Sequence, residues 1–292
     1  MSHRKRMISQ ASAAELFGLV TLRLATDRLA TDRLATDGHR AANQAEAVHQ
    51  LRVNLRKART ALKLFEPLLP RERYRTADRR LRAEAHRYDM RRDLDVLRHE
   101  ILPRLLPVVG GTAQKKLAGR IRAADRAAAR PVTPDRVTSE RITAVVSAAG
   151  PRLHSTRASR LSGRKFLHQR LDSLTARARR RLRRSTRDDR SALHRLRIAL
   201  KQLRDAQLLS RDFLPRRQRI DLAPLRRATA ALGELQDLER ARVLLTGFVR
   251  EDPRHAEAVT AAVLRLENLH RAAAPEALRL ARRALGKSAR KS

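Results

Sequence analysis

The sequence has no cysteine and no tryptophan, and it holds only five phenylalanines and two tyrosines in 292 residues. Without cysteine the chain cannot form disulfides, thiolate zinc sites, iron–sulfur clusters or a cysteine nucleophile. The shortage of aromatic rings argues against a surface that stacks splayed-out nucleic-acid bases. Acidic residues are also scarce, since 30 aspartates and glutamates stand against 67 lysines and arginines.

Long apolar runs are missing as well. No stretch approaches the roughly 18 consecutive apolar residues that a membrane-spanning helix needs. The basic start and the apolar run near the N-terminus resemble a signal peptide, but Glu15 interrupts the run and a helical pattern follows it. We therefore expect no membrane contact and a cytoplasmic location.

The positive charge is the dominant property of the chain. The formal net charge is +37, and nine lysines accompany 58 arginines. A protein this basic is expected to bind a polyanion. The candidates are a nucleic acid, an anionic membrane or another phosphate polymer. The arginine fork suits phosphate oxygens in particular, although the codon bias of a GC-rich genome explains many surface arginines equally well. Hydrophobic residues make up 42% of the chain, which is enough for a folded core.

The pattern predicts an all-α protein. Alanine, leucine, arginine and glutamate dominate, and glycine and proline are sparse. Pro134, Pro253 and Pro275 suit first-turn positions, with Thr133 and Asp252 as N-caps. The expected helices cover residues 10–37, 44–66, 70–91, 93–106, 112–130, 134–149, 161–187, 190–212, 215–234, 236–250, 253–272 and 275–286.

A long-range repeat divides the chain into two helical halves. Residues 48–66 read VHQLRVNLRKARTALKLFE, and residues 193–211 read LHRLRIALKQLRDAQLLSR. A second match, at almost the same offset, aligns residues 81–97 with residues 225–241. Two matches in the same order imply two similar halves, 1–150 and 151–292, that meet near Gly150 and Pro151.

On a helical wheel, the first repeat places a basic stripe between two apolar edges. Val48, Leu51, Leu55, Ala58 and Leu62 form one edge, and Val53 and Leu64 form the other. The face with Gln50, Asn54, Lys57 and Ala61 should meet solvent. A stripe bracketed in this way should line a groove or pore that needs a counter-anion. We take as binding candidates His49, Arg52, Arg56, Lys57, Arg59 and Lys63, and in the second repeat His194, Arg197, Lys201 and Arg204.

Other constellations point to simpler roles. Glu46 and His49 have the spacing of di-iron ligands, but the second repeat has Ser191 at the matching position, so we expect no metal. The two repeat histidines suit hydrogen-bond donors to an anion, with a phosphoryl acceptor or a buried structural residue as alternatives. Glycine-rich phosphate loops and nucleophile motifs are missing, so we expect neither enzyme activity nor a cofactor. The acids Asp93, Asp95, Asp237 and Glu239 are expected to form structural ion pairs or N-caps.

The repeated pattern H-x-x-R-x-x-x-[RK]-x-x-R, each copy followed by [RQ]-D-x-[DE], resembles the CHAD family, the conserved-histidine α-helical domain. The resemblance covers about residues 10–285. It implies two pseudo-symmetric helical bundles around a basic central cavity, and binding of inorganic polyphosphate, often at polyphosphate granules, with no established catalysis. The implied binding residues are His49, Arg52, Arg56, Arg59, His194, Arg197, Lys201 and Arg204.

The second half departs from the first in two places. It has Leu232-Gly233 where the first half has Tyr88-Asp89, and Gln236 where the first has Arg92. These differences leave open whether both halves contribute equally. The leading hypothesis is non-catalytic binding of polyphosphate. The alternatives are sequence-independent nucleic-acid binding and, less favoured, an enzyme that processes polyphosphate or triphosphates.

Overall fold

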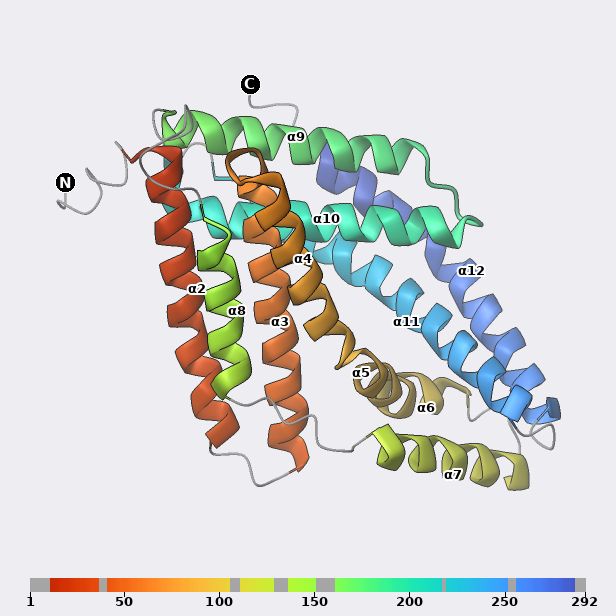
Figure 1. Ribbon diagram of the computed structural model, residues 1–292. Coiled ribbons are helices and arrows are strands. Elements are labelled where there is room, and N and C mark those ends of the chain that lie inside the picture. Colours follow the sequence, from red (N-terminus) through yellow and green to blue (C-terminus); the bar gives the residue numbers. More distant parts are fainter. Residues whose placement is uncertain are drawn as a thin grey trace. The chain divides into compact units, whose positions relative to one another are not determined.

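The protein is built almost entirely of helices. The computed structural model describes residues 11–36, 41–105, 111–128, 136–150, 161–216, 219–251 and 256–286 (Figure 1). About 90% of these described residues are helical, and within them the β-structure amounts to one isolated bridge between Ser12 and Ser162. The predicted all-α fold class is therefore confirmed.

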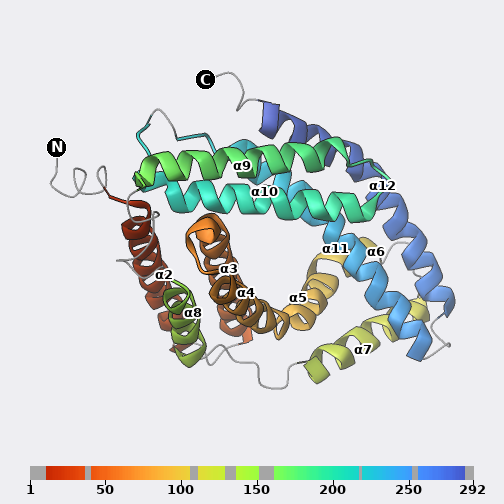
Figure 2. The same ribbon diagram turned by 45° about the horizontal axis from the view of Figure 1, so that its top comes forward.

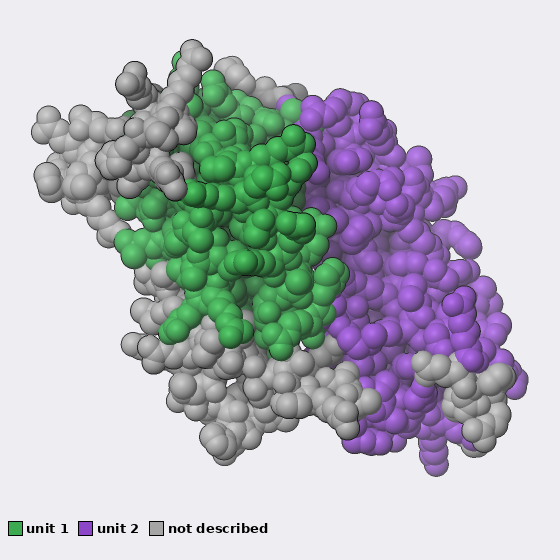
Figure 3. All heavy atoms as spheres, viewed as in Figure 1, with its two compact units in different colours: residues 1–88, 132–176, 202–221 green, residues 89–131, 177–201, 222–292 purple. Residues whose placement is uncertain are grey.

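The chain packs as two compact units, coloured separately in Figure 3. Unit 1 comprises residues 1–88, 132–176 and 202–221, and unit 2 comprises the remaining residues. Both units draw residues from each of the two halves expected from the repeat. Because neither unit coincides with one half of the sequence, the division near residue 150 stays a prediction.

Unit 1 surrounds the helix that carries the first repeat. This helix, α3 (Ala41–Phe65), packs against α2 (Ala13–Thr36), α4 (Arg71–His86) and α8 (Arg136–Ala148), as Figures 1 and 2 show. The unit also contains the turns η1 (Glu66–Leu68) and η4 (Arg211–Phe213), the first part of α9 (Gly163–Arg183) and the end of α10 (Arg190–Ser210). Neighbours on several sides leave α3 little surface for solvent.

The solvent-facing side that the helical wheel assigned to α3 is wrong. Ala61 is fully buried, and Gln50, Asn54 and Lys57 are half-buried. The reason is that three helices pack against α3, so that it has no broad solvent face. The apolar sector itself is correct, because its members Val48, Leu51, Leu55, Ala58 and Leu62 are all buried.

Three of the few aromatic residues meet in the core of unit 1. Phe65 of α3 contacts Phe17 of α2 edge-to-face at 5.4 Å between ring centroids, and it stacks on Phe166 of α9 at 5.5 Å. Such pairs contribute about 1 kcal/mol beyond the area that they bury. The phenylalanines thus tie the consecutive helices α2 and α3 to α9, which comes much later in the sequence.

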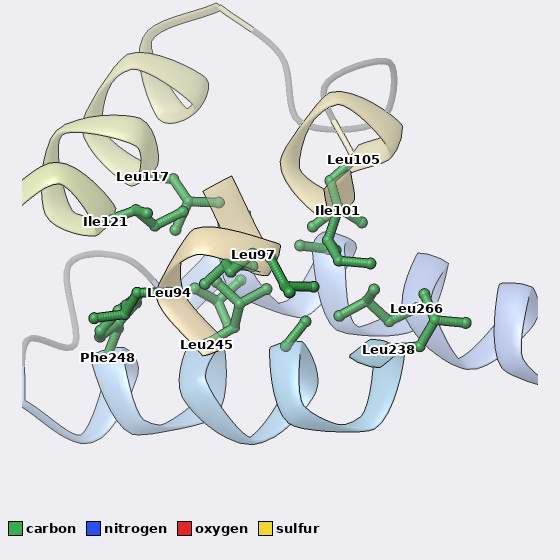
Figure 4. Packing of buried hydrophobic residues seen from close by; sticks show 14 residues of the cluster. Leu94, Leu97, Ile101, Leu105, Leu117, Ile121, Leu238, Leu245, Phe248 and Leu266 are labelled. Atoms are coloured by element: carbon green, nitrogen blue, oxygen red, sulfur yellow. The ribbon is translucent and has the colours of Figure 1, made fainter. Parts of the chain in front are cut away.

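Unit 2 has a separate leucine-rich core (Figure 4). Its helices are α5 (Asp89–Val96), the π-helical turn η2 (Leu97–Ile101), α6 (Leu102–Leu105), α7 (Gly111–Ala128), α11 (Ala223–Glu251) and α12 (Ala256–Gly286). The first three place apolar side chains against α7, α11 and α12. The end of α9 and the first part of α10 also belong to this unit. The core residues labelled in Figure 4 are Leu94, Leu97, Ile101, Leu105, Leu117, Ile121, Leu238, Leu245, Phe248 and Leu266.

Two expected helix breaks do not occur. The segments 215–234 and 236–250 were expected as separate helices, yet α11 is continuous over Ala223–Glu251. The break expected before Pro275 is also wrong, because this proline lies inside α12. A proline in a helix interior costs about 3 kcal/mol. Burial of Ala274, Ala277 and Leu278 on both sides of it offsets that cost. The N-caps proposed at Thr133 and Asp252 lie outside the described residues.

Gly163 is required by the close approach of α9 to the start of α2. A Cβ atom at this position would lie 2.4 Å from Leu16 Cδ1 and 2.7 Å from the Ala11 carbonyl oxygen, both in unit 1. We expect Gly163→Ala to lower the free energy of unfolding by about 2 kcal/mol through overpacking. Urea denaturation of the full chain measures this loss.

The matched control is Gly119→Ala in α7, where an added Cβ would meet nothing within 4 Å. Because alanine is the better helix former by about 1 kcal/mol, this variant should be neutral or more stable. Equal destabilisation by the two substitutions would contradict the steric explanation for Gly163.

Candidate functional site

The basic stripe on α3 is half-buried. The side chains of Arg56, Arg59 and Lys63 are 34%, 35% and 25% exposed, and Arg52 is also half-buried. His49, at the start of the stripe, is exposed. The stripe therefore belongs neither to the core nor to a freely solvated face, and its charges need partners.

A buried aspartate joins residues from the two sequence repeats within unit 1. Arg56 Nε donates to Asp205 Oδ2 at 2.7 Å, and Arg204 donates to Asp205 Oδ1 through Nε at 2.9 Å and Nη2 at 2.7 Å. The Asp205 side chain is 4% exposed. One carboxylate thus fixes two guanidinium groups, and a net positive charge remains.

Asp205 was missed by the sequence analysis. Its only signal is an acidic residue inside the basic second repeat, at the position where the first repeat has Thr60. Predicting the pairs would have required knowing that α3 and the end of α10 lie together in one unit.

A second shared carboxylate lies on α4. Asp78 accepts a hydrogen bond from Arg59 Nε at 3.0 Å and another from Arg82 Nη2 at 2.9 Å. Nearby, the Lys63 ammonium pairs with Glu66 at 2.5 Å and lies 5.6 Å from the centre of the Tyr74 ring. Arg56 and Arg59 both use Nε in their ion pairs, so the terminal Nη groups of both are outside these pairs. Those groups can donate to phosphate oxygens.

The second basic stripe begins in unit 2 with His194, Arg197 and Lys201 of α10, all half-buried. His194 Nδ1 donates a hydrogen bond to Gln236 Oε1 of α11. This bond fixes the ring and leaves Nε2 available for a ligand. In the sequence Gln236 is recognisable only as a departure from the first half, whereas in the structure its side chain orients His194.

The environment of His194 disfavours its charged form. Burial lowers the pKa of this imidazole, and the positive charges of Arg197, Arg240 and Arg195 lower the pKa further, against the opposing hydrogen bond to Gln236. Asp237 shows the converse effect. Burial raises the pKa of its carboxyl group, and the nearby Arg197 and Arg240 partly counteract this.

The four acids expected to be structural have different surroundings in unit 2. Asp93 forms an ion pair with Arg240, and Glu239 forms ion pairs with Arg190 and Arg242. The backbone carbonyl oxygen of Asp95 accepts a hydrogen bond from His99 Nδ1 at 3.0 Å. These contacts agree with a structural role, which stays a prediction.

Metal-binding clusters and membrane-spanning helices are both absent from the residues that the structure describes. Histidine and acidic side chains in those ranges do not gather in groups of three that could hold a metal ion. None of the described helices is both long and apolar enough to cross a membrane.

The fold and the repeated basic motif define a known class of helical domain. The family model of the CHAD domain matches residues 23–246, and the chain therefore belongs to the CHAD domain family. The family resemblance seen in the sequence is confirmed.

Two solved structures share the fold. The CHAD domain from the plant Ricinus communis is 24% identical, covers 95% of this chain and 93% of its own, and superposes with a TM-score of 0.68. PptA from Streptomyces chartreusis is 17% identical over 94% of this chain and 99% of its own, with a TM-score of 0.69. No curated protein matches the chain.

Proposed function

We propose that this protein binds inorganic polyphosphate, without catalysis, through the basic residues of α3 and α10. The CHAD domain family is reported to bind polyphosphate. The observation that carries the proposal is the sharing of carboxylates by arginines in unit 1: Asp205 between Arg56 and Arg204, and Asp78 between Arg59 and Arg82. Shared carboxylates position the guanidinium groups and leave net positive charge for phosphate oxygens.

The placement of the aromatic residues favours polyphosphate over single-stranded nucleic acid. All five phenylalanines and Tyr88 are buried, and Tyr74 is half-buried beneath Lys63. Among these rings only Tyr74 is partly accessible, so the chain presents little aromatic surface on which bases could stack. Polyphosphate has neither bases nor sugars, so guanidinium groups alone can recognise it. A cytoplasmic location, with polyphosphate granules as the place of binding, belongs to the same proposal.

Direct competition tests the proposal. Long-chain polyphosphate and duplex DNA compete for the purified full chain at a fixed salt concentration, because both affinities fall steeply with salt. We expect polyphosphate to bind more tightly, and tighter binding of DNA would overturn the proposal. The same sample, incubated with labelled polyphosphate and magnesium, tests the absence of catalysis. Chain shortening or labelling of the protein would show an enzyme.

Binding should depend on pH through His194. A bound polyanion stabilises the imidazolium and raises the pKa that burial and neighbouring arginines have lowered. The affinity should therefore be highest at pH values below the lowered pKa of His194 in the free protein, and should fall as pH rises through the pKa of His194 in the complex. Titration calorimetry with long chains measures this, because only the chain ends titrate near neutral pH.

The control for this prediction is His49→Gln combined with His194→Gln, which keeps hydrogen-bond donors at both positions. The variant should retain most of its affinity at pH 8 and lose the pH dependence between 8 and 6. An unchanged pH profile would assign the effect to other groups.

A further inference from the structure

Helix α4 carries a basic face of its own. Arg75, Arg79, Arg82 and His86 recur at helical spacing along one side, over a length of about 16 Å. These four residues line an open hollow of about 460 Å³ in unit 1, together with Tyr74 and Asp78. This face lies outside the two repeated basic motifs.

Two of the α4 residues that line the hollow, Tyr74 and Asp78, also contact the stripe on α3. Asp78 pairs with Arg59 of α3 on one side and with Arg82 of α4 on the other, at 3.0 and 2.9 Å. The Lys63 ammonium of α3 lies over the Tyr74 ring, which forms part of the hollow's wall. An anion bound along α3 therefore has a neighbouring row of cations on α4.

The acids in the hollow do not neutralise its arginines. Arg75 pairs with Glu72 at 3.3 Å, but the two side chains are 51% and 79% exposed, so the pair is weak. Arg79 donates a long hydrogen bond of 3.5 Å to the neutral hydroxyl of Thr76. Asp78 is already shared by two arginines. An excess of positive charge therefore lines the hollow.

We propose that the α4 face is a second phosphate-binding surface that extends the α3 stripe and gives the protein a preference for long polyphosphate chains. The inference rests on the proposed function. A short chain is held by the α3 residues alone, whereas a longer one continues past Asp78 and places further phosphates against Arg82, Arg79 and Arg75. Each added contact releases counterions and strengthens binding.

The test compares two double variants, each of which removes two positive charges from a different side of α4. Arg75→Gln with Arg79→Gln removes two positive charges from the hollow. It leaves Arg82 in place, because Arg82 forms an ion pair with Asp78. The matched control, Arg73→Gln with Arg80→Gln, changes the net charge equally at two exposed positions of the same helix. These control residues line a different hollow, next to Val145 and Ala149. All four positions are exposed, and far-UV spectra should show unchanged helicity.

We expect the hollow variant to lose about tenfold in affinity for long-chain polyphosphate and less than twofold for tripolyphosphate. The slope of log Kd against log salt should fall by roughly 1.5 with long chains. The control should lose less than twofold with either ligand. Long-chain polyphosphate should also protect Arg75 and Arg79, but not Arg73 and Arg80, from modification by phenylglyoxal.

The outcomes separate the two proposals. Equal losses in both variants, or no chain-length dependence in the hollow variant, would overturn the second surface while polyphosphate binding itself stands. Failure of the unmodified protein to bind polyphosphate would overturn the proposed function.

Discussion

Reversing one arginine in each repeat, by Arg52→Glu with Arg197→Glu, is expected to weaken polyphosphate binding by about a hundredfold or more. Both residues are half-buried members of the repeated motif, one in each unit. Under the proposed function, each reversal removes a phosphate contact and places a like charge beside the ligand, so the losses should exceed those of simple neutralisation. Equilibrium binding at physiological salt measures the change.

The control places the same charges elsewhere. Arg226 and Arg227 are exposed on α11, and Arg226→Glu with Arg227→Glu changes the net charge by the same amount. Because solvent and salt screen exposed charges, this variant should lose less than about threefold. Equal losses in the two variants would show diffuse attraction to the whole basic surface.

A second variant is needed beside the charge reversal, because the reversal can also destabilise the fold. Arg197 stabilises the charged form of the partly buried Asp237. A glutamate at position 197 would repel that carboxylate. Arg52→Gln with Arg197→Gln avoids the like-charge contact and should still lose about tenfold in affinity. If the glutamine variant stays folded and binds as tightly as the unmodified protein, the two arginines are not part of the binding surface.

The helices and the basic stripe could be predicted from the sequence because both are local patterns. The spacing of Leu51, Leu55, Ala58 and Leu62 alone identifies a buried helix face, and all four are buried. The spacing of the arginines likewise places them on the neighbouring face. This is why the family motif was visible before any packing was known.

Features that depend on packing could not be predicted. Ala61 looks like part of a solvent face until α2, α4 and α8 are placed around α3. Pro275 looks like a helix start, because the sequence does not show that the flanking alanines are buried. The same limit applies to Gln236, whose contact with His194 joins residues 42 positions apart.

The two halves also differ where the sequence departs from its repeat. In the first half α4 ends at His86 and α5 begins at Asp89, with a fully buried Tyr88 between them. The corresponding segment of the second half, around Leu232 and Gly233, lies inside the continuous helix α11. We still predict that the two halves superpose with His49 on His194 and Asp93 on Asp237. The superposition has to match the break between α4 and α5 with a continuous part of α11.

Removing the carboxylate that the two repeats share should destabilise the protein strongly. Asp205→Ala leaves Arg56 and Arg204, whose side chains are 34% and 19% exposed, without the carboxylate that fixes them. Losing one partner of a fully buried pair costs 3–5 kcal/mol, and solvent access to both arginines reduces this. We expect a loss of about 2–3 kcal/mol in the free energy of unfolding, measured by urea denaturation.

An exposed ion pair in the same unit provides the comparison. Asp212 pairs with Arg23 at 2.6 Å, but its side chain is 59% exposed, so Asp212→Ala should cost less than about 1 kcal/mol. Asp205→Asn should fall between the two, because its amide oxygen still accepts a hydrogen bond but no longer carries charge. If Asp205→Ala and Asp212→Ala cost the same, the buried carboxylate does not anchor the two arginines. The geometry around Arg56 and Arg204 would then have to be maintained by the packing of α3 and α10 alone.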